Sequence, residues 1–131
     1  ELMKTIFSVV IFISTLTNNN MFNSNIFHGN WKAIWSISKK NLDSIPSPKT
    51  NTMLGHVSFE ENGKVYLEGF GNSDCIFSSD TISYNTSWTI QNNKLIVGHN
   101  QLNQFEYKIN SLAKDEIQLT LLDDISLVLR K

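Results

Sequence analysis

Cysteine and proline are scarce in this chain of 131 residues, which has one cysteine, Cys75, and two prolines. A single cysteine excludes an internal disulfide and a zinc site built from several cysteines. The net charge of −1 and the pI near 6.3 leave no basic surplus to neutralise phosphates, so we expect no nucleic acid partner. Charged residues make up only 18% and hydrophobic residues 40%, a balance that predicts a folded domain with its own core.

The chain also lacks an apolar run that could span a bilayer as a helix, which needs about 20 residues. A shorter apolar run at 5–16 follows the positive charge of Lys4 and precedes a polar stretch at 17–20. This order is typical of a secretion signal. We therefore expect a signal peptide or N-terminal hydrophobic segment at 1–20, one domain at 21–131, and a secreted or periplasmic protein. After processing we expect no stable membrane insertion, whereas an uncleaved segment would anchor the protein.

Helical periodicity of useful length is missing after residue 29, and apolar residues instead recur at every second position. That spacing predicts strands with one buried face. In the first of them Trp31, Ala33 and Trp35 point to the same side. Two prolines, Pro46 and Pro48, disfavour ladder hydrogen bonds and predict a long loop at 38–53.

The register of the first hairpin can be derived, because residues that face each other in an antiparallel pair share one face of the sheet. A two-residue turn at Asn62-Gly63 would pair residues of opposite faces. A three-residue loop at 61–63, with Gly63 in the left-handed position of a G1 bulge, pairs Phe59 with Val65 and keeps the faces consistent.

The second hairpin favours a two-residue type I′ turn at 92–93, because asparagine tolerates the positive φ angles of that turn. This turn pairs Ile90 with Leu95. With the strands expected around 105–109, 117–121 and 127–130, the total is about eight in up-and-down order, a pattern that usually closes into a barrel. We predict an all-β fold, an antiparallel up-and-down barrel.

The head of the first strand, Gly29-Asn30-Trp31, resembles the Gly-x-Trp signature of calycin-type lipocalins and of bacterial lipocalin-like domains. The resemblance implies a lipocalin-like barrel in which Gly29 and Trp31 close one end and Arg130 packs on the tryptophan. The family's disulfide and C-terminal helix have no counterpart in the sequence. Further segments that resemble the family are 57–63, 87–95, 107–112, 116–119 and 129–130.

A META-type exported β domain is the alternative resemblance. It is suggested by the run Gly69-Phe70-Gly71-Asn72, which is followed by Cys75.

Inward-facing side chains near the loops at 38–53, 70–80 and 100–103 combine an apolar wall with a few polar tips, the composition typical of small-molecule pockets. We hypothesise an exported protein that binds a small hydrophobic or amphipathic molecule in the barrel mouth. The alternative is a filled barrel that acts as a surface interaction or envelope-maintenance module without such a ligand. The expected lining residues are Trp35, Tyr84, His99, Phe105, Tyr107 and Leu121.

Catalysis and metal binding are not indicated. The strand pattern places His56 outward, His99 inward and His28 ahead of the first strand, so the three histidines are not expected to converge on a metal. No serine lies in a nucleophile motif. We expect a protein that is not an enzyme and needs no cofactor, and the sequence names no protein partner.

Overall fold

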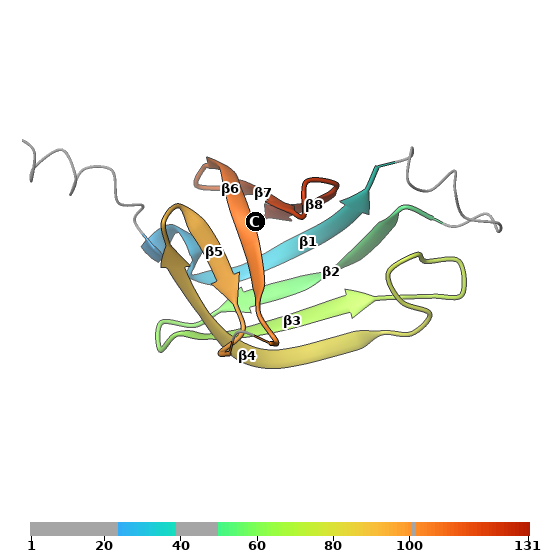
Figure 1. Cartoon of the computed structure of the whole chain (residues 1–131), viewed down its shortest axis with the longest axis horizontal. Coiled ribbons are helices and arrows are strands. Elements are labelled where there is room, and N and C mark those ends of the chain that lie inside the picture. The colour runs from blue at the N-terminus through green and yellow to red at the C-terminus, as the bar shows by residue number, and fades with distance from the viewer. Residues whose placement is uncertain (1–23, 39–49, 101) are drawn as a thin grey trace, which may run out of the picture.

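The computed structural model describes residues 24–38, 50–100 and 102–131, so the hydrophobic segment expected at 1–20 and most of the loop expected at 38–53 lie outside the described residues. Eight antiparallel strands, each hydrogen-bonded to the next in the chain, form a closed barrel in which β1 also pairs with β8 (Figure 1). The predicted all-β, up-and-down fold is confirmed. The elements are a short 3-10 helix η1 (Ser24–Phe27), β1 (Gly29–Ile37), β2 (Thr52–Phe59), β3 (Lys64–Phe70), β4 (Ile82–Gln91), β5 (Lys94–Val97), β6 (Phe105–Leu112), β7 (Glu116–Leu121) and β8 (Ile125–Arg130).

The β2–β3 hairpin has the predicted register, with Phe59 facing Val65. Gly63 has a φ of 82°, the left-handed conformation that a G1 bulge requires. The Glu60 N–H donates to the Lys64 carbonyl at 2.8 Å, which closes the turn.

The β4–β5 hairpin also confirms its prediction, since Ile90 faces Leu95. Asn92 and Asn93 have φ angles of 51° and 63°, as a type I′ turn requires. The turn residues therefore determine which side chains of β4 and β5 face the interior.

Two strand boundaries differ from the prediction. The loop expected at 38–53 overlaps β2, which starts at Thr52 and pairs Met53 with Trp35.

The other difference concerns the sixth and seventh strands, which the prediction joins through residues 110–116. In the structure β6 continues to Leu112, and its register against β7 shifts between Ile109 and Ser111. The extra residue, Asn110, forms a β-bulge, which interrupts the alternation of apolar and polar residues along β6. For this reason the prediction from alternation placed the end of this strand before the bulge.

Helix η1 closes one end of the barrel, which we call the closed end (Figure 1). The fully buried Phe27 side chain packs edge-on against Phe59, with ring centroids 5.4 Å apart, and lies 5.9 Å from the Trp88 ring. The Trp31 indole N–H donates to the Phe27 carbonyl at 2.7 Å. This hydrogen bond satisfies a buried polar group and holds η1 across the barrel.

Lys131, the residue after β8, completes the closed end. Lys131 Nζ lies 4.2 Å from the Trp31 ring centroid and donates to the His28 carbonyl at 3.2 Å. Gly29 has a φ of 111°, and a Cβ atom at this position would lie only 2.7 Å from Lys131 Nζ. Glycine therefore provides both the backbone conformation and the room for the lysine.

The role that the resemblance implied for Arg130 needs correction. Arg130 alternates with the buried Leu129 and so points outward, where its Nε lies 3.1 Å from the Glu116 carboxylate. The cation over the tryptophan belongs to the next residue, Lys131.

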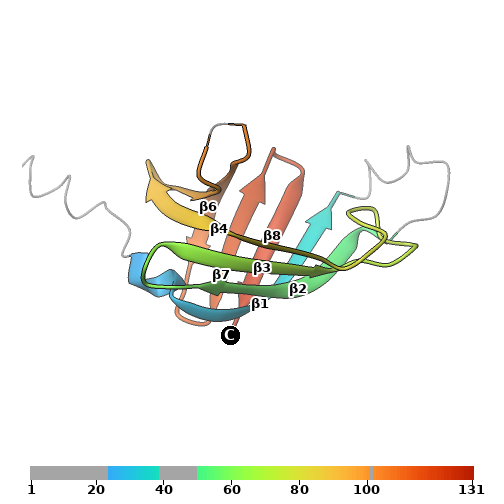
Figure 2. The ribbon, with the colours of Figure 1, turned by 90° about the horizontal axis from the view of Figure 1, so that it is seen from below.

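Buried side chains fill the interior between the closed end and the middle of the barrel. In Figure 2, β2 and β3 cross in front of β7 and β8, and the two pairs form opposite walls. The most deeply buried strand residues are Trp31, Val57, Val65, Leu95, Ile117, Leu119, Leu127 and Leu129.

No helix among the described residues is long and apolar enough to cross a membrane.

We predict that Phe27→Ala lowers the free energy of unfolding by about 3–5 kcal/mol, because it leaves a cavity against Phe59 and Trp88. Phe70→Ala is the matched control, since that ring is 40% exposed and should lose far less. Urea unfolding followed by tryptophan fluorescence measures both. Equal midpoints for the two variants would show that η1 contributes nothing to closure.

Candidate functional site

The opposite end of the barrel, where β1, β3, β5 and β7 end, is called the mouth here. Strand registers place five of the six predicted lining residues on the interior face there; for example, Tyr84 faces Leu67 and Phe105 faces the buried Val97. The sixth, His99, follows the end of β5, and its Nδ1 lies 3.0 Å from the hydroxyl oxygen of Thr86.

Trp35 and Tyr107 form the base of the mouth. They come from β1 and β6 and keep only 7% and 5% of their surface exposed. Burial raises the pKa of the Tyr107 phenol, while the hydrogen bond from Trp35 partly offsets that rise. The two rings thus meet across the interior and separate the mouth from the filled core.

A glycine makes room for the base. A Cβ atom on Gly55 would lie 2.9 Å from the Trp35 ring and would also collide with the Glu68 carbonyl of the neighbouring strand. The interior face of β2 therefore stays flat beneath the indole. A glycine inside a strand is a sequence signal for such a close approach, and sequence reasoning did not use it here.

Above the base, two inward-facing rings are not covered. Tyr84 is 61% exposed and Phe105 is 54% exposed, although both point to the interior. Leu121, on the opposite wall, is partly buried against the core. Among the described residues, the buried rings therefore end at Trp35 and Tyr107, and the rings of Tyr84 and Phe105 beyond them are exposed.

The β3–β4 loop covers one side of the mouth. Cys75 in this loop is buried, and its Sγ lies 3.8 Å from the Thr52 carbonyl. Thr50 and Cys75 form a parallel bridge, and Phe77 packs against the core. Cys75 therefore behaves as a small buried apolar residue, and the exposed part of the mouth lies along β4, the β5–β6 loop and β6.

Charge is absent from the interior face of the strands that the structure describes. In the described strands every position that shares a face with the core carries an uncharged side chain. Polar groups on the exposed part of this face include the Tyr84 phenol and the Thr86 hydroxyl, which is paired with His99; His99 also lines a depression on the outer face. An ionised group brought into the mouth would lose hydration without meeting a counter-charge.

The three histidines do not converge. His28 packs against Trp88 at the closed end, with ring centroids 5.6 Å apart, and His56 packs against Phe70 on the outer face at 5.4 Å. Within the described ranges no three His, Cys, Asp or Glu side chains are grouped to hold a metal ion.

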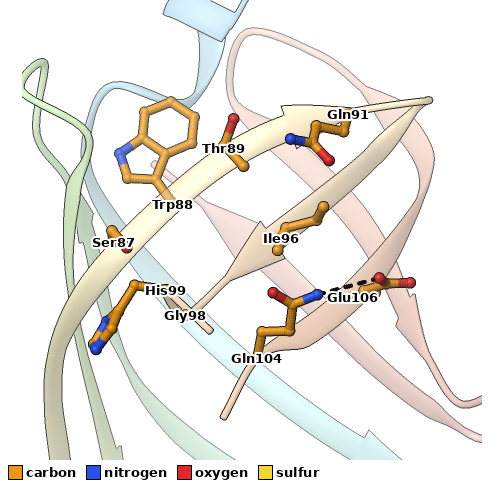
Figure 3. A pocket seen from close by; sticks show the side chains of 9 residues that line it. All are labelled: Ser87, Trp88, Thr89, Gln91, Ile96, Gly98, His99, Gln104 and Glu106. Carbon is orange, nitrogen blue, oxygen red and sulfur yellow. Dashed lines mark hydrogen bonds between the residues drawn. The ribbon is translucent and has the colours of Figure 1, made fainter. Parts of the chain in front are cut away.

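A depression of about 370 Å³ lies on the outer face of β4, β5 and β6. Figure 3 shows Thr89, Gln91, Gln104 and Glu106 arranged around Ile96. The only carboxylate in this groove already lies 3.6 Å from an ammonium group, that of Lys94. The groove is open and polar, and it has no convergent set of unpaired groups that would select a ligand.

Neither the scan against protein-family models nor the search of the curated proteins gives a match to this chain.

We predict that the stability of the protein decreases at alkaline pH partly because of Tyr107. Its pKa is higher in the folded than in the unfolded chain, so this stability is present below about pH 10 and is lost as pH rises through the folded value. Urea midpoints between pH 8 and 11 should therefore fall less steeply for Tyr107→Phe than for the wild type.

Tyr66→Phe is the control for this experiment. The pKa of the Tyr66 phenol is raised by its hydrogen bond to Glu68, but the group lies at the surface, where solvent screens the interaction. Its replacement should change the alkaline slope less than that of Tyr107. An unchanged slope in Tyr107→Phe would contradict the placement of a buried phenol at the base of the mouth.

Proposed function

We propose that this protein binds a small hydrophobic or amphipathic molecule in the mouth of its barrel, as an exported lipocalin-like protein. The observation that carries the proposal is that Tyr84 and Phe105 point to the interior and are still more than half exposed. Inward-facing rings in a filled barrel would be covered by side chains from the opposite wall. Exposed apolar surface of this kind is stabilised when a ligand removes it from water.

The chemistry of the mouth limits the ligand. Two exposed rings offer flat apolar surface, and aromatic groups favour offset or edge-on contacts with other rings. The Thr86–His99 pair and the Tyr84 phenol can exchange hydrogen bonds with one polar group of the ligand. Because no charged side chain of the described strands shares this face, the part of the ligand inside the mouth is uncharged.

Export and family membership rest on other observations. Export is supported by the apolar run at 5–16 after Lys4. A lipocalin-like relationship is supported by the up-and-down order of eight strands and by the burial of Trp31 at the closed end.

The second candidate function is that of a filled barrel acting through its surface. It is supported by the complete filling of the interior between the closed end and Trp35, which restricts any ligand to the mouth. In that case the outer faces would carry the function and the exposed rings would contact a partner. Ligand uptake by the isolated protein separates the two candidates.

We predict that the protein binds Nile red, an uncharged apolar dye, saturably and one to one. Phe105→Ala should weaken this binding about tenfold, the loss expected for removing one well-packed aromatic contact. Phe70→Ala is the matched control, because its ring is exposed on the outer face of the barrel. Fluorescence titration measures the affinity, and native mass spectrometry measures the stoichiometry.

Two results would contradict the proposal. One is the absence of saturable binding to the wild type. The other is an equal loss in Phe105→Ala and Phe70→Ala, which would place the dye on the surface and favour the filled-barrel function.

A further inference from the structure

Strand β4 is much longer than its neighbour β5. Its first half, Ile82–Ser87, pairs with β3, while only its second half, Trp88–Gln91, pairs with β5. Figure 1 shows β4 continuing beyond the end of β5 toward the β3–β4 loop. The first half of β4 therefore has a strand on one side only.

After β5 the chain turns sharply away from β4. Gly98 has a φ of 120°, and a Cβ atom there would lie 2.3 Å from the Asn103 carbonyl, so only glycine fits the turn. Figure 3 shows β5 ending at Gly98 beside β4. The line that β5 would have followed along β4 is left open beyond His99.

Backbone directions show which groups face this open line. The Gly98 N–H donates to the Ser87 carbonyl at 2.8 Å, so Ser87 directs its backbone groups toward β5, whereas the Trp88 N–H donates to Gly63 on the β3 side. Backbone direction alternates along a strand. Ser83 and Asn85 therefore direct an N–H and a carbonyl each toward the open side, where no strand among the described residues pairs with them.

Three devices that usually protect an edge strand are missing from this stretch of the described chain, which we call the β4 edge. Residues 81–87 contain no charge and no proline, and their pairing with β3 is free of bulges. Ser83, Tyr84 and Asn85 are exposed. The half-paired start of β6 is shorter and carries Glu106, so it is a poorer template.

We propose that the β4 edge binds an extended, uncharged peptide by strand addition, with one of its apolar side chains between Tyr84 and Phe105. Pairing with Ser83 and Asn85 satisfies four backbone groups, and the alternation of side chains along the added strand directs every second one into the mouth. The peptide lies along β4 where β5 would lie if its pairing with β4 continued beyond Gly98.

The geometry favours a peptide over a second copy of the barrel. The open stretch is about five residues long and ends against His99, which is hydrogen-bonded to Thr86. A single extended segment fits such a gap. A second barrel would have to bring the strands beside its own β4 into the same short gap.

The first test uses the wild-type protein and two peptide probes. One is a fluorescein-labelled, end-capped peptide of alternating threonine and phenylalanine, and the other has the same sequence with alternate backbone amides N-methylated. Methylation removes the donors but keeps every side chain, so binding measured by fluorescence anisotropy should weaken about tenfold or more. Equal affinity of the two peptides, or no binding of the first at millimolar concentration, would overturn the proposal.

The second test uses variants at Ser83. Its N–H points away from β3, so Ser83→Pro removes an edge donor without breaking the β3–β4 ladder, and peptide affinity should fall about tenfold. Ser83→Ala is the matched control, because it removes only the hydroxyl and should bind the peptide like the wild type. A loss in Ser83→Ala equal to that in Ser83→Pro would contradict a backbone interaction.

The small-molecule function and the strand-addition site can fail separately. Ser83→Pro should leave Nile red binding unchanged, because the Ser83 side chain points away from the mouth, while Tyr84→Ala should weaken both. Peptide binding without dye binding would reject the small molecule alone. The proposal would be overturned in favour of a second copy by two results together. The wild type would form a concentration-dependent dimer that Ser83→Pro dissociates, and it would not bind the peptide.

Discussion

The width of the barrel, fixed by eight paired strands, is the constraint on which the other features depend. Paired backbones cannot move apart to accommodate large side chains, so the interior holds only as much volume as the enclosed space permits. At the closed end that space is taken by Phe27, Trp31 and Trp88, and the Trp31 hydrogen bond to Phe27 makes η1 part of the filling. At the other end the last buried aromatic rings of the described strands are those of Trp35 and Tyr107. Among the described residues, the mouth is thus the part of the enclosure where inward-facing rings stay exposed.

The strand pattern and the hairpin registers could be predicted because both are encoded locally. A requirement that facing residues share one side is enough to choose between turn lengths, and Gly63 and the Asn92-Asn93 pair have the conformations that the chosen turns need. The same alternation placed Tyr84 and Phe105 on the interior face. Their exposure could not be predicted, because it depends on what the opposite wall contributes.

Other features depend on contacts between distant parts of the chain. Phe27 lies in a polar stretch without periodicity, so nothing local marks it as the residue that closes the barrel. The cation over Trp31 proved to be Lys131, because the strict alternation of β8 turns Arg130 outward. The resemblance implied a residue type and a region, and the strand geometry decided which of two neighbouring cations could reach the ring.

The shortness of β5 links the two sites proposed here. A longer β5 would have paired with the first half of β4 and so covered both the edge at Ser83 and the side of the mouth at Tyr84. The turn at Gly98 removes that strand, and a glycine is required there because any side chain would meet the Asn103 carbonyl. Exposed rings and unpaired backbone groups therefore appear together for one reason. A ligand that contacts only the rings leaves the backbone groups of β4 hydrogen-bonded to water, which costs little free energy in an open mouth. An added strand contacts the rings and also pairs with these backbone groups, as a longer β5 would have done.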